Sequence, residues 1–186
     1  MSTLEQAAVL MLKALHETGI PHMLVGGFTT NYYGIARSTK DVDIVVELPS
    51  RAPLLEVEKR LPSTFEFDSQ ITFETITGNL RHIVHIKGTP FVIELFELRD
   101  EPFQKERFHR RKELYVPQLD IVVTIPTAED VVIQKLRWGR SKDIDDARDV
   151  LAVQADRLDY AYIEDWCRKL GRFETYQQVR ATVPNI

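Results

Sequence analysis

The sequence predicts an α/β (α+β) fold: a mixed, mostly antiparallel sheet with flanking helices, followed by a helical subdomain. Two observations carry this prediction. Short apolar runs bounded by glycine, proline or polar residues recur as far as residue 125, as is typical of strands. Apolar residues recur at helical spacing near the N-terminus and again after Pro126. We therefore expect an α/β core over residues 1–125 and a helical subdomain over residues 126–186.

Local patterns place the individual elements of this fold. Before the acidic segment at residue 41 we expect a helix over 4–15, a strand over 23–25 and a short helix over 28–33. After it we expect a strand over 42–46, a helix over 49–61, β-rich stretches over 71–76, 81–86 and 91–98, a charged helix over 103–113 and a strand over 121–125. Four helices follow, over 128–139, 143–154, 160–170 and 173–181.

Composition bounds the class of protein. The 186 residues are 44% hydrophobic, enough for one core or for a main domain plus a small helical one. A net charge of −4 is not that of a general polyanion-binding surface. The single cysteine, Cys167, cannot form an internal disulfide, and no apolar run approaches the roughly 20 residues needed to cross a bilayer. We expect a cytoplasmic protein with no membrane partner.

Two carboxylates on one buried strand are the most informative feature of the sequence. Residues two apart on a strand point to the same face, so Asp41 and Asp43 should project together from the apolar run that follows them. Paired carboxylates that have lost solvent repel each other unless a cation neutralises them. Carboxylate and phosphate oxygens are ligands that suit Mg²⁺, and a pair of such ions assists in-line phosphoryl displacement.

A pair of glycines precedes these acids. Gly26 and Gly27 follow the strand over 23–25, and glycine lets backbone approach a phosphate without a Cβ in the way. The N–H groups of the helical turn that follows point at anions. Alternatively, the glycines only make a tight turn and the two acids flank a loop. The combination of both motifs with a strand before and after favours the functional interpretation.

The glycine pair after a first strand and the Asp-x-Asp on the next strand together resemble the signature of the polymerase β-type nucleotidyltransferase superfamily. Residues 37–41, Arg-Ser-Thr-Lys-Asp, look like the Arg-x-Thr-x-Asp motif of the AbiEii-type toxin nucleotidyltransferases and of their small uncharacterised relatives. Segments 127–130, 135–137 and 142–146 are similar to the helical part of that group. The resemblance covers roughly residues 20 to 155.

The resemblance implies a site and a reaction. The third acid of the family lies on a later strand, where this chain offers Glu94, a departure from the usual aspartate, with Glu97 as the competitor on the opposite strand face. Asp41, Asp43 and Glu94 would be catalytic and hold Mg²⁺, with nucleotide bound between the two parts of the chain. Gly26, Gly27, Thr39 and Lys135 would bind the nucleoside triphosphate, ATP among the candidates. The reaction implied is transfer of a nucleoside monophosphate to a hydroxyl, releasing pyrophosphate.

Three features of the sequence allow a second interpretation. Lys135 sits on an apolar helical stripe, where lysines usually extend their ammonium group to solvent, and a triphosphate-binding role has about equal weight. Asp143 either begins a helix or positions Lys135, and the former is preferred. The basic run over 107–112 could grip an RNA backbone, but a solvated helix face is favoured.

The biological role is open at the level of sequence. The acceptor is unknown, with tRNA and protein as candidates for a toxin-type enzyme that a cognate antitoxin would silence. The alternative from another class is a catalytically silent module that keeps the fold and binds nucleotide or a protein. A lost acid would mark such a module, and all three acids are present here.

Overall fold

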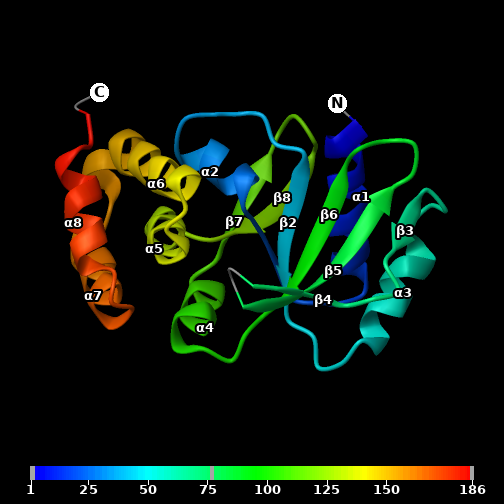
Figure 1. Cartoon of the computed structure of the whole chain (residues 1–186). Coiled ribbons are helices and arrows are strands. Elements are labelled where there is room, and N and C mark those ends of the chain that lie inside the picture. Colours follow the sequence, from blue (N-terminus) through cyan, green and yellow to red (C-terminus); the bar gives the residue numbers. More distant parts are fainter. Residues whose placement is uncertain (1–2, 76–77, 185–186) are drawn as a thin grey trace. The chain divides into compact units, whose positions relative to one another are not determined.

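The computed structural model describes residues 3–75 and 78–184 of the chain (Figure 1). It forms two compact units, the first made of residues 1–28 and 38–125, the second of residues 29–37 and 126–186. The short segment 29–37 therefore groups with the C-terminal helices, although it precedes the acidic strand in the sequence. The boundary that the sequence suggests between residues 125 and 126 stays a prediction about folding domains.

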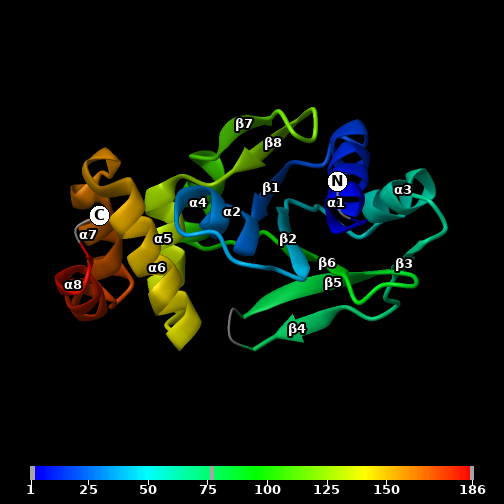
Figure 2. The same cartoon turned by 90° about the horizontal axis from the view of Figure 1, so that it is seen from above.

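The first unit is built on a six-stranded sheet with the order β1-β2-β6-β5-β3, while β4 also pairs with β5 (Figure 2). Its strands are β1 (His22–Val25), β2 (Asp41–Val46), β3 (Phe65–Phe67), β4 (Thr72–Glu74), β5 (Asn79–Ile86) and β6 (Val92–Glu97). Only β2 and β6 pair in parallel, and every other pair in this sheet is antiparallel. The predicted mixed, mostly antiparallel sheet is confirmed.

One face of this sheet has an apolar centre. Leu24, Ile44 and Leu95 are aligned across β1, β2 and β6, and all three are fully buried. Helices α1 (Thr3–Glu17) and α3 (Ala52–Arg60) contact each other, and α1 contacts β2. Alternation along the strands then puts Asp41 and Asp43 on the opposite face.

The acid-bearing face is covered at one end by helix α4 (Pro102–His109). Phe108 of this helix joins a buried cluster with Met23, Val25 and Val45. Because Val45 follows Asp43 by two residues, it lies on the same face, further along β2. The acids thus occupy the N-terminal end of β2, beyond the apolar cluster.

The helix expected over 103–113 is shorter than predicted. It ends at His109, and Lys112–Val116 forms strand β7, antiparallel to β8 (Ile121–Ile125). The charged residues of this stretch favoured a helix locally, but pairing with the apolar β8 decides its conformation, as tertiary context often does. Strand β3 was not anticipated, and the predicted stretch over 71–76 forms β4 only at Thr72–Glu74; Ile76 lies outside the described residues.

The second unit is helical. Its elements are the end of α2 (Gly27–Tyr33), α5 (Ala128–Trp138), α6 (Ser141–Gln154), the 3₁₀ turn η1 (Ala155–Arg157), α7 (Tyr160–Lys169) and α8 (Phe173–Ala181). Tyr33 secures the early segment: its hydroxyl donates to the Pro126 carbonyl at 2.9 Å, and Gln154 Nε2 donates to the Tyr33 carbonyl at 2.7 Å. No described helix of either unit combines the length and apolarity needed to cross a membrane.

Candidate functional site

Three carboxylates share the open end of one sheet face. Asp41 and Asp43 lie two residues apart on β2, and Glu94 of the parallel strand β6 is the register partner of Asp43. Directly paired residues of neighbouring strands point to the same side of a sheet, and the strands lie about 4.8 Å apart. The backbone therefore brings the three acids predicted from the sequence to one place in the first unit.

The close approach of Asp43 explains why Gly26 is a glycine. Val25 pairs with Asp43 across β1 and β2, and Gly26 follows with a φ of +68°, in the left-handed region that favours glycine. A Cβ at this position would lie 1.8 Å from Asp43 Oδ2. The space beside Gly26 therefore holds the Asp43 carboxylate, and the predicted contact of Gly26 and Gly27 with phosphate stays a prediction.

Gly27 leaves room for the Thr39 side chain in the same way. A Cβ on Gly27 would lie 2.9 Å from the Thr39 hydroxyl oxygen. That hydroxyl is 3.2 Å from the Asp41 carbonyl oxygen, to which it donates, and 3.4 Å from the Asp41 backbone nitrogen, from which it accepts. Thr39 thus fixes the first residue of β2, and its predicted contact with nucleotide stays a prediction.

Substituting Gly26 tests this arrangement, with Gly19 as a matched control. Gly19 has the same φ of +68° but no atom within 4 Å of its added Cβ. We expect Gly19→Ala to cost about 1 kcal/mol for the left-handed backbone alone. Gly26→Ala should cost about 1–3 kcal/mol more, because Asp43 must move. Urea unfolding of both variants measures the difference, and equal losses would contradict the packing role of Gly26.

Glu94 has a cationic partner on the next strand. Arg81 Nη1 of β5 donates to Glu94 Oε1 at 2.9 Å, and the two side chains are only 24% and 17% exposed. Burial raises the pKa of Glu94 above its ordinary value; Arg81 opposes this rise and nearby Asp41 adds to it. Glu97 lies on the other face, 2.8 Å from the ring nitrogen Nε2 of His82.

The donor chemistry of this face fits a divalent cation. Carboxylate oxygens from neighbouring strands are ligands that Mg²⁺ accepts together with water and phosphate oxygens. Within residues 3–75 and 78–184, no three side chains of His, Cys, Asp or Glu already stand close enough together to hold a metal. Asp41 and Asp43 would form the centre of such a site, and Glu94 would contribute Oε2, since Oε1 accepts from Arg81.

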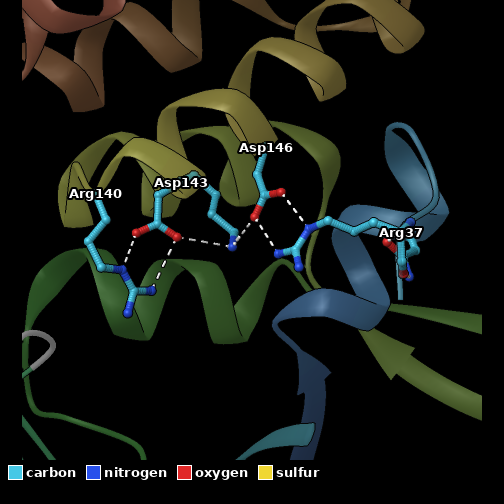
Figure 3. A network of polar contacts seen from close by, with 6 residues as sticks. Arg37, Arg140, Asp143 and Asp146 are labelled. Atoms are coloured by element: carbon cyan, nitrogen blue, oxygen red, sulfur yellow. Dashed lines mark hydrogen bonds and ion pairs between the residues drawn. The ribbon is translucent and has the colours of Figure 1, made fainter. Parts of the chain in front are cut away.

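A second cluster of charges is buried in the helical unit (Figure 3). Lys135 Nζ on α5 donates to Asp143 Oδ1 at 3.2 Å and to Asp146 Oδ2 at 2.7 Å, both on α6. Arg37 binds Asp146 through two nitrogens, each at 3.0 Å, and Arg140 Nη2 donates to Asp143 at 3.2 Å. Asp143 thus lies in the first turn of α6, as preferred from the sequence, and it also contacts Lys135, as the second interpretation expected.

Lys135 does not extend to solvent, contrary to one of the two interpretations of its sequence pattern. The residue is only 5% exposed, and its ammonium group lies between two carboxylates. Burial by itself would raise the pKa of Asp146, but hydrogen bonds from Arg37 and Lys135 outweigh it and hold the pKa below its ordinary value. The triphosphate-binding role of Lys135 stays a prediction.

The basic run over 107–112 does not form one exposed cationic face. Arg107 is buried, at 5% exposure, within α4. The Arg111 guanidinium lies over the Phe108 ring, 4.0 Å from its centroid. Two of the cations of this run are thus engaged by the fold of the first unit.

Comparison with known proteins places the chain in a family. Residues 4–175 match the family described as "Nucleotidyl transferase of unknown function (DUF2204)", and the chain belongs to this family. The resemblance to nucleotidyltransferases is confirmed, and the chain is a transferase of this class. No curated protein matches the chain.

Solved structures share the fold. ANT(2")-Ia in complex with adenylyl-2"-tobramycin superposes with a TM-score of 0.62 at 13% identity, covering 94% of this chain and 99% of that one. An antigenic nucleotidyltransferase-like protein from Paracoccidioides brasiliensis gives 0.57 at 21% identity, covering 98% and 95%. JHP933 from Helicobacter pylori gives 0.53 at 16% identity, covering 96% and 76%. These likenesses concern the fold.

Proposed function

We propose that this protein transfers a nucleoside monophosphate from a nucleoside triphosphate to a hydroxyl acceptor, assisted by Mg²⁺ held by Asp41, Asp43 and Glu94. The observation that carries the proposal is the strand register, which pairs Glu94 with Asp43 on the face that also bears Asp41. The fit of Asp43 against Gly26 supports it, because the sequence keeps an open backbone there for a carboxylate.

The proposed step is an in-line displacement at phosphorus. The acceptor oxygen forms a bond to the α-phosphorus, and the bond from that phosphorus to the bridging oxygen breaks, its electron pair leaving with pyrophosphate. The hydroxyl proton passes to the carboxylate of Glu94, which lies on the same face as the two aspartates. Bound Mg²⁺ would offset the charge on the phosphate oxygens and lower the pKa of the attacking hydroxyl. Asp41 and Asp43 hold the cation on the sheet face.

A binding measurement tests the metal assignment without knowledge of the acceptor. Mg²⁺ and a nucleoside triphosphate together should raise the unfolding temperature by more than the sum of their separate shifts, because phosphate oxygens complete the metal coordination. In Asp43→Asn this excess should vanish. Equal shifts from triphosphate with and without Mg²⁺ would contradict a metal site and indicate a plain anion pocket.

One observation favours the second candidate, a nucleotide-binding module that performs no transfer. Glu94 is engaged by Arg81, so the third acid has a partner other than a metal. Incubation with α-³²P-labelled nucleoside triphosphates and total RNA or protein separates the candidates. Label that enters an acceptor with wild type and not with Asp43→Asn supports transfer and identifies the acceptor class, tRNA or protein. A toxin role would further require an antitoxin partner that abolishes this labelling.

A further inference from the structure

Arg81 of β5 and Glu94 of β6 form an ion pair beside the proposed metal site. Arg81 pairs with Thr72 of β4 on one side and with Phe96 of β6 on the other. Since Phe96 follows Glu94 by two residues, Arg81 and Glu94 point to the same face. The 2.9 Å ion pair therefore lies on the face that carries Asp41 and Asp43.

The Glu94 side chain is flanked by charges of opposite sign. Its backbone pairs with Asp43 on β2, while its Oε1 reaches the guanidinium of Arg81 on β5. Arg81 also offsets one of three neighbouring negative charges before any cation is bound.

We propose that Arg81 is a positioning residue that holds Oε1 of Glu94 and thereby directs Oε2 toward the cation at Asp41 and Asp43. The inference rests on the proposed function. A glutamate side chain fixed in one rotamer loses conformational entropy, and an ion pair already present in the metal-free protein reduces the part of that loss that falls on metal binding. Partners that orient metal ligands typically change affinity or activity by about 10–100-fold.

The geometry favours positioning over direct contact with phosphate. Arg81 Nε is shielded from solvent and has no hydrogen-bond partner within the described part of the chain. The inner side of the guanidinium therefore faces protein, and the outer nitrogen Nη1 faces Glu94. An arginine that binds phosphate would instead present its N–H donors to open space.

Metal binding can be followed directly with Mn²⁺ by electron paramagnetic resonance, with a non-transferable α,β-methylene triphosphate present. We expect Arg81→Met to weaken Mn²⁺ binding about 10–100-fold. Arg81→Lys should retain the fold and bind Mn²⁺ with intermediate affinity, because its single ammonium cannot orient the carboxylate as a planar guanidinium does. Arg60→Met, which removes an exposed ion pair with Glu56 at 3.6 Å, should bind as wild type does.

A double-mutant comparison separates action through Glu94 from other roles. In the Glu94→Gln background, Arg81→Met should add no further loss of Mn²⁺ affinity or kcat. Additive losses, or a rise in the triphosphate KM with kcat unchanged, would overturn the inference in favour of direct phosphate contact. Wild-type Mn²⁺ affinity in both Arg81→Met and Arg81→Lys would also overturn it.

The same measurements distinguish failure of this inference from failure of the proposed function. If Mn²⁺ binding depends on Arg81 but wild type labels no acceptor, the positioning role is supported and the transfer reaction is contradicted. If Mn²⁺ binding does not depend on Arg81 while transfer proceeds, the transfer reaction is supported and the positioning role is contradicted.

Discussion

Asp43→Asn is expected to lower nucleotidyl transfer by about a thousandfold or more, since one substitution removes a metal ligand and the charge that holds the cation. The residue lies at the centre of the acidic site: Glu94 is its register partner and Gly26 leaves room for its carboxylate. The fold should survive. Asparagine nearly matches aspartate in shape, and losing one of two adjacent negative charges relieves repulsion with Asp41 in metal-free buffer.

The measurement combines single-turnover labelling with thermal unfolding in buffer that contains a chelator. Asp41→Asn should show the same loss of transfer, and Asp100→Asn provides the matched control. The Asp100 side chain is 91% exposed and pairs with Lys105 on the surface of the same unit. Full activity in both Asp41→Asn and Asp43→Asn would refute the metal assignment. Loss of folding in either variant would make the acids structural.

The acid pair and its strand illustrate what local pattern can predict. Asp41 and Asp43 share a face because strand alternation has a period of two, and the apolar residues that follow require a buried strand. The same parity places Glu97 on the face opposite Glu94, where the structure shows it beside His82. These inferences need only residues that are close in sequence.

Features that depend on distant residues were not predicted. The contact of Arg81 with Glu94 exists because β5 pairs with β6, and no local signal marks Arg81 among the arginines of the chain. The strand β7 forms because β8 pairs with it, although its own charges favour a helix. Nor did the sequence indicate that Gly26 accommodates Asp43, because the overlap depends on how β1 pairs with β2.

In the second unit, too, contacts between residues distant in sequence could not be predicted from local patterns. The sequence offered a solvent-extended and a phosphate-binding role for Lys135; the buried position between two carboxylates excludes the first, and the second stays a prediction. The signal that could have found it was the recurrence of acids three residues apart at the start of α6, which puts Asp143 and Asp146 on one helical face. Arg37, more than a hundred residues away, could not be linked to Asp146 by any local pattern.

Lys135→Met is expected to have the largest effect on stability, a loss of about 3–5 kcal/mol, because the buried carboxylates of Asp143 and Asp146 lose the ammonium group that donates to both. Asp143, which is fully buried, would keep its contact with Arg140, and Asp146 would keep its contact with Arg37. The control is Lys169→Met in the same unit, whose exposed ion pair with Asp165 should contribute less than about 1 kcal/mol. Urea unfolding at neutral pH measures both losses.

The pH dependence of this loss follows from the sign of the Asp146 shift. Because contacts in the folded protein lower the pKa of Asp146, its stabilising contribution is present above the unfolded value of about 3.9 and is lost as the pH falls through the folded pKa. The difference between wild type and Lys135→Met should therefore shrink below about pH 4. A variant that keeps wild-type stability but loses the joint Mg²⁺ and triphosphate stabilisation would show that Lys135 serves the nucleotide instead.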